Sequence, residues 1–577
     1  DFYDFFAAAR EKGAAGSPAR AFVFEAEQDP RRSAALAATL LRHGVRVSRT
    51  TTPFAARGVS LETGQAERVD LEPGSYLVDM AQPDQRAAET FLAREAPMDP
   101  AFVREQYARW SLNARRAEKA ERELYEFYDL TSWSLPLAYG VAAWELAELP
   151  AVESEPLQPR EERLAGSGDW ASEIPFEMPG FDAGVVGRIA SVDGAIEPAA
   201  DGARAGSAYL FRPEAEGSMR LVAALLKEGY RVAVALAPLE VGAQKFPRGS
   251  FAVQVDRNPD TLHERLPELA REAGVAVWAA DTAFASRGKI GLGSHRVVGL
   301  RRPRIAMLAD EGVRITEYGA AWFTLEKRLG YPFTPIRFDE LLRADLDELD
   351  VIVLPNGSSR AYGKALGEEG AQMLAGWIER GGTLVTWGSG GAEWAIQAEL
   401  VSSSFVGIRE ESENEGADAG PGESGERLAQ IDELAPEAPR PPVPSPSADP
   451  DRPQPIPGSV ARTRLDPTHW LTLGYSRQEL PVLVRGHRFL GLSESGENPV
   501  VFSEADRLRV AGFFWPGNSE LWLAGSAYAL VEPKGKGQVV LFAQDPNYRL
   551  VWRATSRLFA NALLLGPTLG TDVSQGL

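Results

Sequence analysis

The sequence contains no cysteine and only five histidines among its 577 residues. Without cysteine the chain has no disulfide, no thiolate nucleophile and no cysteine-ligated metal site. The histidines are His43, His263, His295, His469 and His487. None stands in the His-x-x-Glu or His-Glu-x-x-His spacing of a zinc peptidase, so we expect no metal ligands. We also expect no nucleotide cofactor, because the glycine-rich segments at 289–296 and 533–538 are not followed by helical patterns.

Long apolar runs are also missing, and none approaches the roughly 20 residues that span a bilayer. We therefore expect no membrane span. The net charge is −20, from 61 basic and 81 acidic side chains. Binding to duplex nucleic acid depends on basic residues that neutralise phosphates, so this balance argues against a nucleic-acid partner. The chain begins with DFYDFFAAAREKG, which is neither an initiator methionine nor a signal peptide. It is therefore expected to be a mature product or a fragment.

An internal repeat is the clearest positive feature of the sequence. Each copy contains a short apolar strand, a polar turn and an amphipathic helix that ends in Leu-Leu-(Arg/Lys)-x-Gly. The glycines after these helices, Gly44 and Gly229, stand where a helix C-terminus takes a left-handed residue. Four landmarks recur in the same order, and this indicates a duplication. The matched segments are 22–47 with 209–232, 73–85 with 248–260, and LAREA at 92–96 with 269–273.

The pattern predicts an α/β protein with several domains. Strand–helix–strand units of this length favour parallel sheets covered by helices. We expect a first α/β repeat over 1–99 and a second over 206–300. Between them, 100–205 reads as a helical and aromatic-rich insertion with an acidic loop, in which 100–127 should be helical. The aromatic run EFYDLTSWSLPLAYG in this insertion favours a core or a domain interface.

A third α/β domain is expected over 301–577. Strand and helix patterns alternate from residue 302, which predicts a doubly wound, flavodoxin-like sheet with extra β segments towards the C-terminus. Residues 409–458 interrupt this domain with an acidic and proline-rich insertion. Such a composition cannot form a core and is typical of a flexible linker.

Residues 383–395, TLVTWGSGGAEWA, place Ser389 in a tight turn between a predicted strand and a helix. Hydrolases present a catalytic serine in this way, but such a serine needs a general base. Downstream of it stand two histidines, His469 and His487, and neither lies in a His-x-Glu pattern. The local pattern W-G-S-G-G also departs from G-x-S-x-G. We favour a chain reversal that requires small residues, and Ser389 and His469 remain as weak catalytic candidates.

Several segments resemble large bacterial zinc carboxypeptidase-like proteins of the M14 peptidase family. These segments are GSYLVDMAQPDQRAAETFLAREAPMDPAF, EFYDLTSWSLPLAYGVAAWE, RLDPTHWLTLGY, ELPVLVRG and KGKGQVVLFAQDPNYRLVWRATSRLFANALL. The resemblance implies a secretory signal and a zinc carboxypeptidase domain upstream, and a degenerate class I glutamine amidotransferase-like domain at the end. The zinc ligands and catalytic glutamate of the family belong to that upstream domain. No position here matches them, so none is carried over.

The resemblance implies a non-catalytic C-terminal region of a secreted or periplasmic M14-like carboxypeptidase. Such a region would act as a scaffold, substrate-presenting or assembly module, and zinc would lie in the missing peptidase domain. Its partners would be that domain or another protein chain, with peptide substrates possible. Two alternatives stay open. One is a degenerate amidotransferase-like or serine hydrolase that uses Ser389, with His469 or His487 as its base. The other is a structural or ligand-binding protein unrelated to peptidases, with clefts at the C-terminal ends of its parallel strands.

Overall fold

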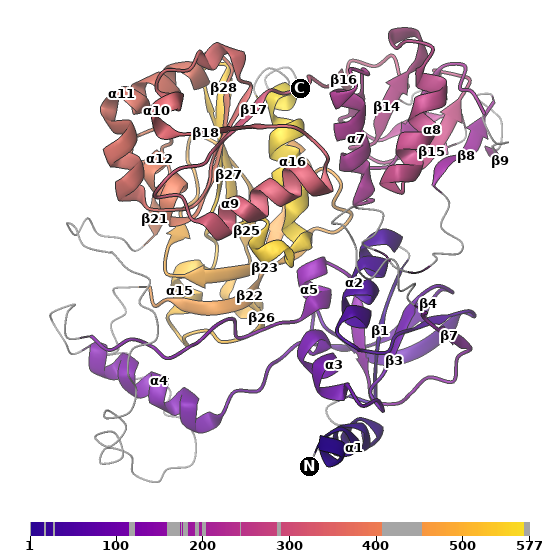
Figure 1. Cartoon of the computed structure of the whole chain (residues 1–577), viewed down its shortest axis with the longest axis vertical. Coiled ribbons are helices and arrows are strands. Elements are labelled where there is room, and N and C mark those ends of the chain that lie inside the picture. The colour runs from indigo at the N-terminus through magenta and orange to yellow at the C-terminus, as the bar shows by residue number, and fades with distance from the viewer. Residues whose placement is uncertain are drawn as a thin grey trace.

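The structure is a computed structural model, and it describes most of residues 2–570. Several segments lie outside this description: 17–18, 27–28, 115–121, 159–173, 175, 177–182, 191–195, 199–202, 243, 286–289 and 407–452. Most of the expected acidic loop in the insertion and most of the acidic, proline-rich insertion at 409–458 therefore fall outside the described residues. Three large sheets carry the remaining chain, and helices pack against them (Figure 1). The expected α/β class is confirmed.

The first two sheets belong to the two repeats, and each has seven strands in the described residues. The first sheet has the order β4-β3-β6-β1-β5-β2-β7 and the second has the order β16-β11-β14-β10-β15-β8-β9. The strands of the first sheet are β1 (Ala21–Phe24), β2 (Ser48–Thr50), β3 (Phe54–Ser60), β4 (Ala66–Leu71), β5 (Tyr76–Asp79), β6 (Ala143–Leu146) and β7 (Ser154–Pro156). Those of the second are β8 (Gly184–Ile189), β9 (Ile196–Pro198), β10 (Ala208–Phe211), β11 (Ala233–Ala235), β14 (Phe251–Gln254), β15 (Ala276–Ala280) and β16 (Val297–Gly299).

The duplication is visible in the pairing of the central strands. The order β6-β1-β5-β2 in the first sheet corresponds to β15-β10-β14-β11 in the second. The registers correspond as well, since Ala21 pairs with Asp79 and Leu146 where Ala208 pairs with Gln254 and Ala280. The helices α2 (Pro30–Arg42) and α7 (Gly217–Lys227) are equivalent. The glycines that follow them, Gly44 and Gly229, have φ of 83° and 87°, as expected for left-handed positions.

The expectation of parallel sheets in the repeats is wrong. Strands β1 and β2 do run in the same direction, as a strand–helix–strand unit requires. However, β5 lies between them and is antiparallel to both. The second repeat has the same arrangement around β14. The physical reason is that the helix crossover leaves a gap of one strand, which the following β segment fills from the opposite direction.

The first repeat extends beyond the expected boundary at residue 99, because β6 and β7 complete its sheet. In the second repeat, α8 (Leu262–Ala273) leads through Gly274 (φ 66°) into β15. In the first repeat, α3 (Gln85–Leu92) ends early. The short helix α5 (Leu135–Tyr139) and Gly140 (φ 68°) lead into β6 instead. The aromatic-rich segment is therefore inserted within the second helical region of the repeat.

The insertion carries α4 (Pro100–Asn113), which is shorter than the helix expected over 100–127. The chain instead returns along α4 in an extended form. Side-chain amides of α4 accept hydrogen bonds from the backbone N–H groups of this returning segment. Asn113 Oδ1 accepts from Glu123 N at 2.8 Å, and Gln106 Oε1 accepts from Glu126 N at 2.9 Å. Side-chain hydrogen bonds have thus replaced the helical ones.

The third sheet contains a parallel half and an antiparallel half, in the order β18-β17-β19-β20-β28-β27-β25-β22-β23. Its parallel strands, numbered along the chain, follow the flavodoxin-like order 2-1-3-4-5. These parallel strands are β17 (Ile305–Leu308), β18 (Thr334–Ile336), β19 (Val351–Leu354), β20 (Thr383–Trp387) and β28 (Gly537–Phe542). The antiparallel strands are β22 (Ile456–Leu465), β23 (Glu479–Gly486), β25 (Glu497–Phe502) and β27 (Ala527–Lys534).

Helices cover both faces of the parallel half (Figure 1). Along each strand the side chains alternate between two separate cores. Ile352 and Leu384 belong to the core under α11 (Ser359–Glu379), whereas Val385 and Trp387 belong to the core that includes α16 (Arg553–Leu564). The Trp387 ring packs edge-on against Phe559 of α16, with 5.8 Å between centroids.

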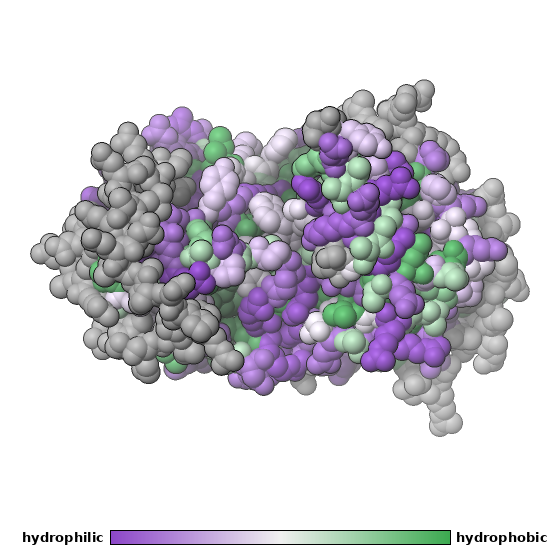
Figure 2. Space-filling view, turned by 90° about the horizontal axis from the view of Figure 1, so that it is seen from below, coloured by the Kyte–Doolittle hydropathy of each residue, from purple (hydrophilic) through white to green (hydrophobic). Residues whose placement is uncertain are grey.

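The core around α16 continues into both repeats and joins the three sheets. The helix α16 contacts α5 of the first repeat and α7 of the second. Seen from below, the described surface is largely hydrophilic with scattered apolar residues, which agrees with the acidic composition (Figure 2). Among the described residues, no helix is long and apolar enough to cross a membrane.

The insertion docks on the third domain through aromatic side chains. Trp110 of α4 lies 5.3 Å from Trp515 and Phe127 lies 4.7 Å from Phe513, measured between ring centroids. The Trp515 side chain is fully buried, and its indole N–H donates to Pro455 O at 2.9 Å. Aromatic rings supply a large apolar area at such a contact, so the interface expected for this segment is the one observed.

We predict that Trp515→Ala lowers the free energy of unfolding by about 3–5 kcal/mol, because it removes a fully buried indole. Urea denaturation followed by circular dichroism measures this change. The control is Tyr128→Ala, in the same insertion, since Tyr128 is 98% exposed. Equal effects of the two substitutions would show that the aromatic contact does not hold the insertion in place.

Candidate functional site

The turn after β20 has the strand–turn–helix geometry of a nucleophile elbow. Strand β20 ends at Trp387, and Gly388 takes a left-handed φ of 71°. The chain then enters α12 (Glu393–Gln397). If Gly390 is the last glycine of a G-x-S-x-G pattern, the nucleophile position is 388 and not 389. Glycine occupies that position, so the residue at the sharp bend has no side chain.

Asn356, which follows β19, fills the space above this bend. Its Oδ1 accepts from the N–H groups of Gly390 and Gly357, both at 2.8 Å. A Cβ placed on Gly388 would lie only 2.5 Å from Asn356 Cγ. A side chain at position 388 would therefore collide with the Asn356 side chain as it is placed in the structure.

Ser389 stands one residue beyond the bend. Its hydroxyl donates to Asn356 Oδ1 at 3.4 Å. No other side-chain hydrogen bond of Ser389 occurs in the described part of the chain, so no imidazole bonds to it there. His487 lies in the turn between β23 and β24 (Phe489–Leu490).

His469 is engaged with its own surroundings. Its Nδ1 accepts from Leu471 N at 3.0 Å, and its Nε2 lies 2.7 Å from Glu497 Oε2. Since Nδ1 accepts a backbone N–H, Nε2 is the ring atom that faces the carboxylate. The interaction with His469 lowers the pKa of Glu497. The two catalytic candidates suggested by the sequence, Ser389 and His469, therefore do not form a hydrogen-bonded pair.

Two buried carboxyl groups lie beside the elbow instead. Glu317 of α9 (Ile315–Trp322) accepts from Asn356 Nδ2 and from the Trp387 indole N–H, both at 2.8 Å. Burial raises the pKa of Glu317 in spite of these bonds. Asp545, after β28, is also buried, and burial together with the Glu317 charge raises the pKa of Asp545 well above its usual range. Because both Glu317 oxygens already accept N–H bonds, we assign the ionised form to Glu317 and the proton to Asp545.

Asp545 and Asn547 carry buried polar atoms that have no hydrogen-bond partner among the described residues. These atoms are Asp545 Oδ2 and both polar atoms of the Asn547 amide. Buried polar groups are nearly always hydrogen-bonded in native proteins, so these atoms are free to bond a small polar molecule such as water. They lie after the carboxyl end of β28, at the edge where doubly wound sheets bind ligands. The backbone just beyond is strained, since Arg549 and Leu550 have φ of 47° and 60°.

Sequence reasoning missed Glu317, Asn356, Asp545 and Asn547. Three of them carry a signal that could have been used, because Asn356, Asp545 and Asn547 come shortly after apolar strands of the doubly wound pattern. Glu317 carries none, since a glutamate in the first turn of a helix is ordinary. In the described residues, no group of three or more histidine, aspartate or glutamate side chains could hold a metal ion.

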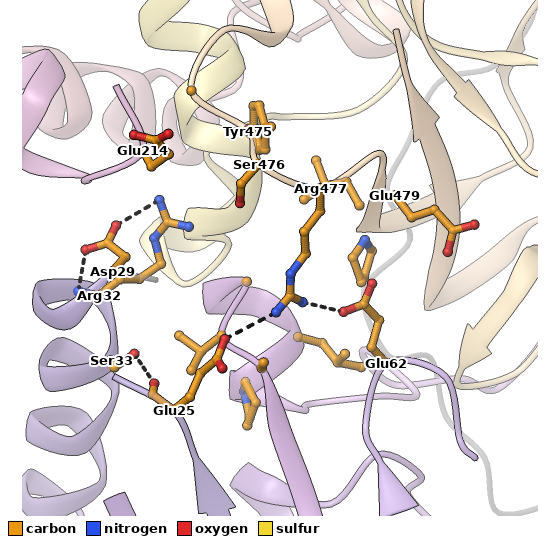
Figure 3. A pocket seen from close by; sticks show the side chains of 18 residues that line it. Glu25, Asp29, Arg32, Ser33, Glu62, Glu214, Tyr475, Ser476, Arg477 and Glu479 are labelled. Carbon is orange, nitrogen blue, oxygen red and sulfur yellow. Dashed lines mark hydrogen bonds and ion pairs between the residues drawn. The ribbon is translucent and has the colours of Figure 1, made fainter. Parts of the chain in front are cut away.

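A cavity of about 70 Å³ lies between the three sheets, and Figure 3 shows its lining. Arg477 of the third domain donates to Glu62 at 2.7 Å and to Glu25 at 3.4 Å, both in the first repeat. Arg32 lies 3.3 Å from Asp29 on the opposite wall. The lining is strongly acidic, because it contains two arginines, Arg32 and Arg477, and five carboxylates, those of Glu25, Asp29, Glu62, Glu214 and Glu479. Such a polar cavity suits a small polar or cationic group.

No protein-family model and no curated protein sequence matches the chain. Some solved structures show low similarity. The β-galactosidase from Bacillus circulans sp. alkalophilus is 11% identical over 45% of this chain and 31% of its own, with a TM-score of 0.23. The exo-β-1,4-mannosidase Op5Man5 from Opitutaceae bacterium strain TAV5 is 11% identical over 54% of this chain and 40% of its own, with a TM-score of 0.26. This chain thus spans well under half of either enzyme. A glutamine amidotransferase from Thermotoga maritima is 9% identical over 45% of this chain and 96% of its own, with a TM-score of 0.26.

We predict that Gly388→Ala lowers the free energy of unfolding by roughly 2–4 kcal/mol, through the left-handed φ and the collision with Asn356. Asn356→Ala removes the colliding atoms, so the double variant should be less destabilised than the sum of the single variants. Urea denaturation of all three variants measures this coupling.

Gly367→Ala is the control for this cycle, because Gly367 also has a positive φ of 56° but its Cβ would meet nothing within 4 Å. It should show strain alone and no coupling to Asn356→Ala. Strict additivity of Gly388→Ala and Asn356→Ala would contradict the steric exclusion.

We predict that Asp545→Asn changes the pH dependence of stability. The folded-state pKa of Asp545 is raised, so the folded protein binds more protons than the unfolded chain, and stability falls as the pH rises from about 4 through that pKa. Asparagine removes this ionisation. The variant should therefore gain more stability relative to the wild type at pH 8 than at pH 5, measured by calorimetry. Asp70→Asn, at a carboxylate that is 75% exposed, is the control. Parallel curves for Asp545→Asn and the wild type would refute the assignment.

Proposed function

We propose that this chain is the non-catalytic C-terminal region of a secreted or periplasmic M14-like zinc carboxypeptidase and acts there as a scaffold or assembly module. The parentage is supported by the sequence segments that resemble that family. In this proposal zinc belongs to the peptidase domain, and the partner is that domain or another protein chain. Peptide substrates of the peptidase would be presented rather than cleaved by this region.

One observation carries the non-catalytic role, namely the elbow of the third domain. Glycine stands at the nucleophile position, and Asn356 occupies the space that a nucleophilic side chain would need. The neighbouring Ser389 hydroxyl donates to that same asparagine, whose side-chain amide cannot act as a general base. A degenerate amidotransferase-like domain would keep the fold and the turn but lack the nucleophile, as this domain does.

The arrangement of the sheets supports a scaffold role. One continuous core joins both repeats to the third domain, and the insertion is held by a second aromatic core. A continuous core of this kind would allow the chain to hold a partner in a fixed orientation, as the proposed scaffold role requires.

The first test is an activity measurement on the purified chain with glutamine, simple esters and short peptides. We expect no turnover above the uncatalysed rate and no difference between the wild type and Ser389→Ala. The matched control is Ser495→Ala, at an exposed serine of the same domain. Turnover that is lost in Ser389→Ala and kept in Ser495→Ala would establish the serine hydrolase alternative instead.

The parentage is tested separately by peptide mapping of the protein from its native source. We expect peptides that join Asp1 to an upstream segment, or a gene that encodes His-x-x-Glu and a later histidine in the same reading frame. An initiator methionine or a signal peptide directly before Asp1 would refute it.

A further inference from the structure

We propose that the junction of the three sheets binds a small oxyanion of the phosphate or sulfate class. The site is a second cavity, of about 40 Å³, on the side of Arg32 that faces α7 and α16. It is larger than the roughly 10–15 Å³ that one water molecule requires. Five arginines line it, and they come from all three parts of the chain: Arg32 from α2, Arg220 from α7, Arg328 from the helical turn after α9, and Arg553 and Arg557 from α16.

Positive charge exceeds negative charge around this cavity. Glu216 is the one carboxylate among its described lining residues. The five arginines therefore outnumber the carboxylates of this lining. Arg553 pairs with Glu216 at 3.3 Å, whereas Arg328 and Arg557 form no ion pair among the described residues. Buried charges that lack a counter-charge are costly, so the site favours an incoming anion.

Burial disfavours the charged forms of three of these arginines, whereas the carboxylates near Arg32 raise the pKa of Arg32. Burial lowers the pKa of Arg557 to about 10, and it also lowers the pKa of Arg328 and that of Arg553. Burial raises the pKa of Glu216, which further weakens the single carboxylate of the lining. An oxyanion bound among these arginines would favour their charged forms.

Several donors at the cavity have no partner among the described residues. They are Nε and Nη1 of Arg328, Nη2 of Arg557 and the hydroxyl of Thr324. Both arginines are held in place by their other nitrogens, since Arg328 Nη2 donates to Leu550 O at 2.9 Å and Arg557 Nε donates to Asn561 Oδ1 at 3.0 Å. Arg557 is 8% exposed and Thr324 is 2% exposed, so bulk water does not satisfy these groups. Planar guanidinium groups fixed in this way match the oxygens of phosphate and sulfate.

The duplication adds a second source of positive potential. The equivalent helices α2 and α7 both begin at this junction, at Pro30 and Gly217. Their cap residues touch, because Asp29 Oδ2 accepts from Glu216 N at 2.8 Å. The positive ends of two helix dipoles therefore meet beside the arginines, and helix N-termini favour anions. An anion at this point would contact elements of both repeats and of the third domain at once, and it would tie them together.

The test measures binding of inorganic phosphate and of sulfate to the full chain by titration calorimetry and by the shift in melting temperature, at constant ionic strength set with chloride. We expect saturable binding of both oxyanions and a rise in melting temperature. Arg328→Gln and Arg557→Gln should weaken binding at least tenfold. Arg68→Gln, at an arginine that is 76% exposed, is the matched control and should bind as the wild type does.

Thr324→Val keeps the proposal testable if the arginine variants fail to fold. Valine has the same shape as threonine, and the Thr324 hydroxyl has no hydrogen-bond partner among the described residues. The free energy of unfolding without oxyanion should therefore be unchanged. Phosphate affinity should nevertheless fall several-fold. Two results would overturn the proposal. One is that chloride gives the same effect as phosphate. The other is that Thr324→Val, together with whichever arginine variants fold, binds phosphate as tightly as the wild type. This outcome is independent of catalysis and of the upstream gene sequence, so it does not bear on the scaffold role.

Discussion

One buried carboxylate, that of Asp29, links the two repeats at the junction of the three sheets. It accepts the backbone N–H of Arg32 in its own helix at 3.2 Å and that of Glu216 in the other repeat at 2.8 Å, and it pairs with the Arg32 guanidinium at 3.3 Å. Leaving such buried donors without an acceptor costs about 1–3 kcal/mol for each group. One side chain therefore caps a helix, joins the two repeats and compensates the arginine that both junction cavities share.

The buried charges of the arginine-lined cavity at this junction are mostly opposite in sign to the net charge of the chain. The chain is acidic as a whole, with a net charge of −20, yet one cavity at its centre is lined by five arginines and a single carboxylate among the described residues. The acidic cavity and the arginine-lined cavity lie on either side of Arg32. A strong local field of this kind arises where domains meet, because residues that are exposed on each separate domain become desolvated together on docking.

Sequence patterns predicted the local features well. The repeated helix with its terminal glycine, the alternation of strands and helices in the third domain and the turn at Gly388 all depend on neighbouring residues, which the sequence displays directly. The position of β5 between β1 and β2, and the splitting of a repeat helix by the insertion, depend on distant pairing. The same dependence on distant pairing explains why the sequence did not reveal most residues of the candidate site. Ser389 was visible because its turn is local, whereas Asn356, Glu317 and Asp545 meet only through the strand order of the sheet. The arginine cluster was not visible at all, because it needs the packing of three domains.

The position of α16 in the sequence has a consequence for synthesis. Arg553 bonds to Glu216 across 337 residues of chain, so the junction closes only after both repeats and most of the described third domain have been made. Domains of a growing chain generally fold as units from the N-terminal side. The two repeats can therefore form their sheets while the helix that joins them to the third domain is still unmade. Until α16 arrives, the starts of α2 and α7 lack the apolar and charged cover that it supplies. Chains that terminate before this helix would then expose the apolar and charged residues of an incomplete junction.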